Sequence, residues 1–250
     1  MKKLIAFDLD GTLAESKSAL TDTMSELLNE LLDNFQVCVI SGGKFEQFEK
    51  QLLGNLKTTP DKLERLHLMP TCGTRYFNYD LANAKWHQVY AEDFTEAEKK
   101  TIIKSLQEGL EECGFDKEKT WGNQIEDRGS QITFSALGQE APVKEKEEWD
   151  PDNSKKAKIR NLVAQKIPNF EVRSGGTTSL DITKLGIDKA YGMERLMKIL
   201  EISKDDILFF GDRLTEGGND YPVKAMGIDS IEITSWKDTA TSLQAILHSI

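Results

Sequence analysis

Two aspartates one residue apart follow the first apolar run of the chain, in the segment LIAFDLDGT. Asp8 and Asp10 stand at positions i and i+2, so their side chains point the same way in an extended segment. Two carboxylates this close repel each other, and burying them is costly unless a cation compensates their charge. The spacing therefore predicts that Asp8 and Asp10 face one site that binds a cation.

Three further polar motifs are predicted where strands of the same sheet end, which is where open parallel sheets bind ligands. The segment FFGDRLTEGGND supplies Asp212, a third oxygen ligand of the kind that Mg²⁺ prefers. Ser41 and Gly42 follow the second predicted strand, where a hydroxyl and backbone amides suit a phosphate. Lys189 opens a later helix and supplies a cation to offset phosphate charge.

Each motif alone has an ordinary structural explanation. An acid at a strand end usually caps a turn, and Ser-Gly-Gly is usually a turn itself. An isolated Lys189 would be a solvated helix residue, and residues 217–220 would form a plain loop. We infer a shared site because the four motifs occur in order, each beside the end of a predicted element.

Strands and helices must alternate to bring these motifs together, and they do so at both ends of the chain. Strands are predicted at 4–10, 36–41, 66–70, 206–212 and 229–234. Helices are predicted at 20–35, 44–56, 188–202, 221–227 and 236–250. This order indicates an α/β fold with a parallel sheet and right-handed crossovers. We therefore expect one core domain made of residues 1–83 and 187–250.

The middle of the chain, residues 84–186, has a different pattern. It reads as helix–strand–strand twice, and the predicted helices are 95–113 and 153–167. The predicted strands are 123–128, 130–137, 170–174 and 178–183. Two such units predict an α+β insert with a four-stranded antiparallel sheet and two helices on one face. The charged segment 138–153 is expected to be a mobile loop.

Composition narrows the class of partner. The net charge of −10 disfavours nucleic acid and anionic membranes, because their phosphates would be repelled. No apolar run approaches the roughly 20 residues of a membrane span, and the apolar start ends at Asp8, unlike a signal peptide. Cys38, Cys72 and Cys113 are odd in number and scattered, which favours reduced thiols and a cytoplasmic location.

With its motifs in this order, the chain resembles the haloacid dehalogenase superfamily of phosphohydrolases and phosphomutases over its whole length. The motifs that carry the resemblance are DLDGT, SGG, GIDKAYG and GDRLTEGGND. The resemblance implies a Rossmann-like parallel-sheet core with an inserted α+β cap domain. It also implies that Asp8 is a nucleophile that forms a phosphoaspartate, and that Asp10 acts first as general acid and then as base.

The same resemblance implies how the remaining motifs are used. Asp8 and Asp212 would hold Mg²⁺ by their side chains, and Asp10 by its backbone carbonyl. Ser41, Gly42 and Lys189 would bind the phosphoryl group during its transfer, and a carboxylate nucleophile would divide that transfer into two easier displacements.

The insert resembles the cap of the eukaryotic-type phosphomannomutase branch, through SGGTTSLDIT, LGIDKAYG and GGNDYPV. In that branch the cap holds the sugar and a second phosphate. The resemblance implies a small phosphorylated sugar as ligand and a homodimer formed through the cap. The residues that it implies for substrate binding are Lys17, Arg128, Ser179, Asp181 and Asn219. The cap members of this set have a structural alternative, a network of cross-strand pairs on one sheet face.

The chain departs from this branch where a second phosphate would bind. Gln139 stands where the branch has an arginine, with Lys144 and Lys146 nearby, and Lys17 lies roughly where it has another in the core. Neither glutamine nor lysine reproduces the bidentate arginine fork. We therefore predict a Mg²⁺-dependent sugar-phosphate phosphatase. The alternatives are a phosphomannomutase that interconverts mannose 6-phosphate and mannose 1-phosphate, and an inactive phosphate-binding regulatory protein.

Overall fold

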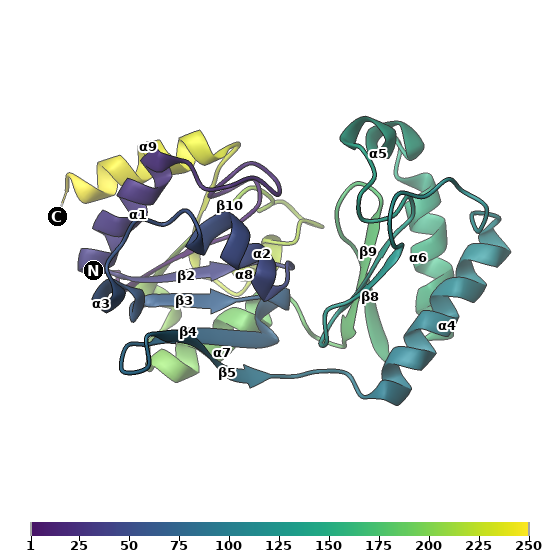
Figure 1. The fold of residues 1–250 in the computed structure, drawn as a ribbon, viewed down its shortest axis with the longest axis horizontal. Coiled ribbons are helices and arrows are strands. Elements are labelled where there is room, and N and C mark those ends of the chain that lie inside the picture. Colours follow the sequence, from purple (N-terminus) through teal and green to yellow (C-terminus); the bar gives the residue numbers. More distant parts are fainter. Residues whose placement is uncertain (1, 250) are drawn as a thin grey trace. The chain divides into compact units, whose positions relative to one another are not determined.

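The computed structural model describes residues 2–249 as two compact units, the second inserted in the first (Figure 1). Unit 1 contains Met1–Ala91 and Asp188–Ile250. Unit 2 is the continuous stretch Glu92–Ile187. The α/β core with an α+β insert that the sequence predicts is therefore confirmed.

A seven-stranded sheet in the order β11-β10-β1-β2-β3-β4-β5 forms the centre of unit 1. Its parallel strands are β1 Leu4–Phe7, β2 Gln36–Ile40, β3 Leu66–Met69, β10 Ile207–Gly211 and β11 Asp229–Glu232. Its α-helices are α1 Asp22–Asn34, α2 Phe45–Phe48, α3 Pro60–Leu63, α7 Lys189–Leu200, α8 Tyr221–Ala225 and α9 Trp236–Leu247. A π-helical turn, Glu49–Leu53, continues α2 directly.

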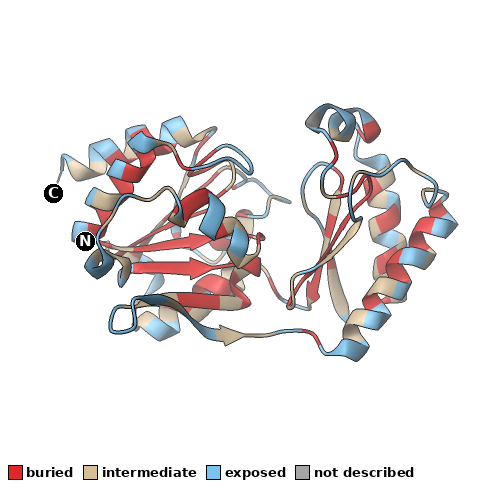
Figure 2. Ribbon diagram, in the orientation of Figure 1, coloured by how far each residue is buried: buried red, intermediate tan, exposed pale blue. Residues whose placement is uncertain are grey.

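Both faces of the parallel strands are apolar, as a sheet covered by helices on both sides requires. Ile5 and Phe7 of β1 belong to one buried cluster, which includes side chains of α1 and α9. Leu4 and Ala6 point to the other cluster, which includes Met193 of α7. Figure 2 shows the central strands buried along their length. Because side chains alternate along a strand, Asp8 continues the Leu4–Ala6 side, where α7 begins.

An antiparallel hairpin, β4 Arg75–Asp80 and β5 Lys85–Ala91, extends the sheet beyond β3. The sequence prediction assigned the second half of this hairpin to the insert. The structure instead divides the chain after Ala91, later than the expected boundary at 83–84, because β5 pairs with β4 along its length. The second division follows Ile187, next to the expected boundary at 186–187.

A four-stranded antiparallel sheet in the order β6-β7-β9-β8 forms unit 2. Its strands are β6 Ile125–Asp127, β7 Ile132–Ser135, β8 Phe170–Ser174 and β9 Ser179–Lys184. Helices α4 Glu96–Cys113 and α6 Ser154–Lys166 pack on one face, where Leu106 and Val163 meet Phe134 in a separate apolar core. The repeated helix–strand–strand pattern and the antiparallel sheet are confirmed.

The expected loop at 138–153 instead contains a helix, α5 Val143–Trp149. Trp149 is buried, and its ring packs edge-on against Phe115 with 5.9 Å between centroids. One aromatic anchor therefore orders a segment whose charge suggested a loop. Among the described residues, no helix combines the length and apolar character needed to cross a membrane.

Candidate active site

The predicted motifs of unit 1 meet at the carboxyl end of β1. Asp8 is buried directly after β1, where its backbone N–H donates to the Phe210 carbonyl at 3.0 Å. Lys189 is the first residue of α7 and is almost fully buried. Its Nζ lies 2.6 Å from Asp8 Oδ1 and 2.6 Å from Asp220 Oδ1. A buried lysine between two buried carboxylates is therefore the centre of the site.

Burial and mutual repulsion shape the charges of this cluster. Burial raises the pKa of Asp8, although the nearby Lys189 opposes this shift. Burial alone would lower the pKa of Lys189, but Asp8 and Asp220 outweigh it and raise that pKa. Burial and the charge of Asp220 also raise the pKa of Asp212. The carboxylates therefore have a strong electrostatic need for a further cation.

Three carboxylates are arranged to meet that need. Asp8, Asp212 and Asp220 each offer an oxygen, and these oxygens lie within 4.8 Å of one another. One lysine cannot neutralise three carboxylates, and an all-oxygen donor set suits a hard divalent ion. The residues present therefore fit the expected Mg²⁺, with Asp220 added to the predicted side-chain ligands Asp8 and Asp212.

Gly11 lets the Asp212 carboxylate approach the first motif. Its φ is +84°, a conformation that residues with a side chain rarely adopt. A Cβ at Gly11 would lie 2.6 Å from Asp212 Oδ2, well inside van der Waals contact. The glycine of DLDGT therefore serves both the turn after Asp10 and the position of the third acid.

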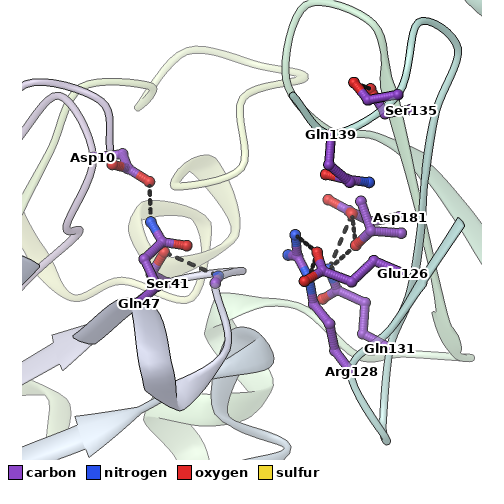
Figure 3. Close-up of polar contacts among 12 residues, drawn as sticks. Asp10, Ser41, Gln47, Glu126, Arg128, Gln131, Ser135, Gln139 and Asp181 are labelled. Carbon is purple, nitrogen blue, oxygen red and sulfur yellow. Dashed lines mark hydrogen bonds and ion pairs between the residues drawn. The ribbon is translucent and has the colours of Figure 1, made fainter. Parts of the chain in front are cut away.

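Contrary to the expectation that the side chains of Asp8 and Asp10 face one cation site, the Asp10 carboxylate is not part of the acidic cluster and bonds to other partners. Its Oδ1 accepts hydrogen bonds from the Lys17 backbone N–H at 2.7 Å and from Gln51 Nε2 at 3.1 Å. Its Oδ2 accepts one from Gln47 Nε2 at 2.7 Å (Figure 3). The carboxylate is thus engaged by three N–H donors, which leaves its backbone carbonyl for the metal role implied by the resemblance.

The Ser-Gly-Gly motif forms a tight loop after β2. Ser41 is buried, and its Oγ accepts a hydrogen bond from the Gly43 N–H at 3.2 Å (Figure 3). A Cβ at Gly42 would lie 3.9 Å from Cys72 Sγ, so this glycine lies against the turn that follows β3. Ser41 and Gly42 therefore lie in a compact backbone loop, and their binding of phosphate remains a prediction.

That neighbouring turn supports the loop from behind. The Cys72 N–H donates to the Ser41 carbonyl at 2.9 Å, and the Thr71 N–H donates to the Gly43 carbonyl at 2.9 Å. Thr71 and Cys72 both have positive φ, at 49° and 56°. Unfavourable backbone angles of this kind persist where surrounding contacts impose them, and they recur at ligand sites.

Two predicted substrate residues of unit 1 occupy loops. Lys17 has a φ of 57° and meets Asp10 through its backbone N–H. Asn219 is exposed in the loop between Asp212 and α8. Their contacts with a ligand remain a prediction.

In unit 2, one face of the sheet is polar. A single register row crosses all four strands, and its members are Glu126, Thr133, Asp181 and Arg173. Asp181 Oδ1 accepts hydrogen bonds from Thr133 Oγ1 at 2.7 Å and Gln131 Nε2 at 2.9 Å. Figure 3 shows Asp181, Glu126, Gln131 and Arg128 gathered on this face. The structure therefore realises the predicted network of cross-strand pairs.

The predicted substrate residues of the cap share this polar face. Arg128 donates from Nε and Nη2 to Glu126 Oε2, at 3.0 and 2.8 Å. Ser179 lies two residues before Asp181 on β9, opposite Ser135 of β7. Gln139 lies in the loop after β7, and its buried Nε2 has no hydrogen-bond partner among the described residues. The site residues expected in the cap are thus brought together within unit 2.

The sequence prediction gave no role in the site to three residues of unit 1, although Asp220 belongs to one of its motifs. Asp220 was visible in GGND, but its pairing with Lys189 depends on how α8 returns to the sheet. Gln47 and Gln51 stand four residues apart on a helix, a spacing common on any solvated surface. Their hydrogen bonds to Asp10 depend on the packing of that helix, so no local sequence signal indicated these bonds.

Comparisons with known proteins indicate the family of the chain and its fold. Residues 5–222 match the family described as haloacid dehalogenase-like hydrolase. A phosphomannomutase of Encephalitozoon cuniculi is 24% identical over 257 residues, covering 100% of this chain and 95% of the relative. The solved IMP-nucleotidase of Plasmodium falciparum aligns with a TM-score of 0.72 at 18% identity, over 99% of this chain and 68% of that one. A haloacid dehalogenase-like hydrolase from Bacteroides thetaiotaomicron aligns with a TM-score of 0.66 at 15% identity, over 98% of this chain and 100% of that one.

Proposed function

The chain belongs to the haloacid dehalogenase-like hydrolase family, and we propose that it is a Mg²⁺-dependent phosphatase of small phosphorylated sugars. The observation that carries this proposal is the cluster of buried Asp8, Lys189 and Asp220 with half-buried Asp212 at the end of β1. Such a cluster combines a carboxylate nucleophile, a fixed cation and a set of metal ligands in one place.

In the proposed reaction, Asp8 attacks the phosphorus atom and forms a phosphoaspartate. Lys189 is bonded to Asp8 Oδ1, which leaves the second carboxylate oxygen to form the new bond. Asp10 gives a proton to the departing sugar oxygen and then takes one from the attacking water. Lys189 and the loop at Ser41 hold the phosphoryl oxygens. Asp8, Asp212 and Asp220 would hold Mg²⁺, which would supply positive charge to offset the charge of the transferring group.

The polar face of unit 2 is an argument for a sugar as the leaving group. Hydroxyl-rich ligands need donors and acceptors, and Asp181, Ser179 and Arg128 supply both. We propose that Lys17 and Asn219 contribute further contacts from unit 1. A homodimer through the cap remains a separate expectation, to be tested by the mass of the protein in solution.

Phosphomannomutase activity is the second candidate, because the relatives found by sequence carry that name over nearly the whole chain. A mutase must retain a sugar bisphosphate while the sugar turns over. Two observations disfavour strong binding of a second phosphate: Arg128 already donates twice to Glu126, and Gln139 carries no charge. Hydrolysis is therefore expected to exceed mutation.

One panel of assays separates the candidates. Phosphate release from hexose phosphates is measured beside a coupled mutase assay that contains a hexose bisphosphate activator. The expected result is Mg²⁺-dependent phosphate release that exceeds interconversion of mannose 1- and 6-phosphate. Faster interconversion would establish the mutase, and no turnover of any ester would leave a phosphate-binding regulatory protein.

The Asp8→Asn variant tests the nucleophile. Activity should fall by about 10³-fold or more, because asparagine cannot form the phosphoaspartate. The fold should survive, because Lys189 keeps its contact with Asp220 and a desolvated carboxylate is removed. Phosphate release and the thermal unfolding midpoint are measured together, and substantial residual turnover in a folded variant would exclude the mechanism.

A further inference from the structure

The carboxylate of Asp10 is held by one helical segment. Gln47 belongs to α2, and Gln51 to the π-helical turn that follows. Both donate from Nε2, one to each carboxylate oxygen, at 2.7 and 3.1 Å. The side-chain amides of Gln47 and Gln51 therefore hold both oxygens of the Asp10 carboxylate.

Gln51 can present only a donor to Asp10. Its Nε2 also donates to the Ser18 carbonyl at 2.9 Å, so a turned amide would place Oε1 against two acceptor oxygens. Gln51 is 4% exposed, and its Oε1 has no hydrogen-bond partner among residues 2–249. A buried acceptor left in this state is destabilising. In the observed orientation Gln51 Oε1 lacks a hydrogen bond, whereas Gln51 Nε2 keeps its bonds to Asp10 and to the Ser18 carbonyl.

Gln47 connects Asp10 to the loop formed by residues Ser41–Gly43. A Cβ at Gly43 would lie 2.2 Å from Gln47 Oε1, so the amide rests directly on the glycine backbone. Figure 3 shows Gln47 extended between Asp10 and the Ser41 loop. Only a residue without a side chain at position 43 leaves room for this amide.

The helical segment that carries both glutamines is firmly anchored. Phe48 and Leu52 are fully buried in the core cluster of unit 1. The Leu20 N–H donates to the Gln51 carbonyl at 2.8 Å, which ties the turn to the loop after Asp10. A π-helical turn changes the helical period locally and is frequent at functional sites. The two amides are therefore held in place by a rigid support.

We infer that Gln47 and Gln51 are positioning residues that orient the Asp10 carboxylate for proton transfer to the leaving group. This inference rests on the proposed function, in which Asp10 is the general acid. Neither glutamine is required to touch the transferring phosphoryl group. Their loss should therefore affect esters whose leaving group needs a proton more than esters whose leaving group does not.

The test compares phenyl phosphate with p-nitrophenyl phosphate, which are similar in size but differ in how much the leaving group needs protonation. The variants are Gln51→Met and Gln47→Met, which keep side-chain length and remove the donor. Lys50→Met, on the exposed side of the same turn, is the matched control, and Asp10→Ala is the reference.

For Gln51→Met, kcat on phenyl phosphate should fall about tenfold more than kcat on p-nitrophenyl phosphate, with KM nearly unchanged. Gln47→Met should show the same selective loss, and it also serves if Gln51→Met fails to fold. Lys50→Met should behave as the unchanged protein.

Equal losses on both esters in folded glutamine variants, beside a selective loss in Asp10→Ala, would overturn the inference alone. Equal losses in Asp10→Ala itself would overturn the acid–base role on which the proposed function depends.

Discussion

Gly11 shows how closely single residues constrain the acidic cluster. Its positive φ and the 2.6 Å approach of Asp212 Oδ2 to a built Cβ are two independent reasons for glycine. Gly114, which ends α4, has a similar φ of +76° but no heavy atom within 4 Å of its built Cβ. Substitutions at Gly11 and Gly114 therefore distinguish the effect of backbone strain, which both share, from displacement of Asp212, which occurs only at Gly11.

Gly11→Ala should raise the Mg²⁺ concentration for half-maximal activity by about tenfold, because the new methyl group displaces Asp212. Both Gly11→Ala and Gly114→Ala should lose about 1 kcal/mol of stability from the left-handed backbone. A magnesium titration of phosphate release, beside thermal unfolding, measures the two effects. An unchanged titration in Gly11→Ala would mean that Asp212 does not help to hold the ion.

Individual residues differ in how far the sequence reveals their roles. Asp8 and Lys189 were predictable because the order of the motifs and the ends of the predicted strands indicate their place. The role of Asp220 could not be predicted because its contact with Lys189 depends on where α8 begins in the folded chain. The role of Gln51 depends on how its helical segment packs, which the local sequence does not indicate. The role of a side chain that depends on how its helix packs is therefore hard to predict from the spacing of residues in the sequence.

At the scale of elements, the hairpin of β4 and β5 supports the Ser41–Gly43 loop through a short chain of contacts. Tyr90 of β5 donates its hydroxyl to the Gly73 carbonyl at 2.8 Å. Gly73 ends the turn that bonds to Ser41 and Gly43. Strand β5, which the sequence prediction assigned to the insert, is therefore part of the support of this loop.

Tyr90→Phe removes this bond and should weaken inhibition by inorganic phosphate about fivefold, in keeping with about 1 kcal/mol for one hydrogen bond. Tyr79→Phe, on β4 of the same hairpin, is the control and should leave the inhibition constant unchanged. The inhibition constant is measured from phosphate release at several phosphate concentrations. Equal constants for both variants would show that the loop does not depend on the hairpin.

A second contact between elements joins β2, β3 and β4. His67 Nε2 lies 2.9 Å from Gln36 Oε1, which can only accept, so Nε2 carries the proton. His67 Nδ1 then accepts from the Tyr76 hydroxyl at 2.8 Å. Burial lowers the pKa of His67 from 6.5 to about 4. The fold therefore favours the neutral imidazole.

This shift predicts a loss of stability in acid. Between pH 6.5 and about 4 the unfolded chain binds a proton at this histidine that the folded chain does not. Stability should therefore fall as pH drops through this window, by up to about 3 kcal/mol. Urea unfolding at several pH values, compared with His67→Gln, isolates the contribution of His67. Parallel curves for the two proteins would contradict it.

Elements with strong periodicity were predictable, and those set by tertiary contacts were not. The amphipathic pattern of α1 and the alternation in β7 decide their structure locally. The π-helical turn and α5 do not follow from such patterns, because buried side chains such as Leu52 and Trp149 fix them from a distance. The edge hairpin escaped prediction because β5 is mostly exposed and its sequence carries little apolar signal.

At the scale of the molecule, each unit has its own apolar core. Leu31 of α1 is fully buried in unit 1, and Leu106 of α4 is fully buried in unit 2. Separate cores imply that local damage in one unit need not spread to the other.

Leu106→Ala should destabilise unit 2 by about 2–5 kcal/mol, since it leaves a cavity in a packed core. Hydrogen–deuterium exchange should then increase across residues 92–187 and stay unchanged elsewhere. Leu31→Ala is the matched change in unit 1 and should show the reverse pattern. Faster exchange throughout the chain in both variants would mean that the two units unfold as one.

The order of strands in unit 1 has a consequence for biosynthesis. Strand β1, which Asp8 follows directly, lies between β2 and β10, so one of its two neighbours is made only after the whole of unit 2. Unit 2 contains all four strands of its own sheet and can complete that sheet while the ribosome is still extending the chain. The edge of β1 meanwhile remains open to wrong pairing. A transcript cut short before Asp212 would therefore yield a folded insert on an unfinished core, without the acidic cluster.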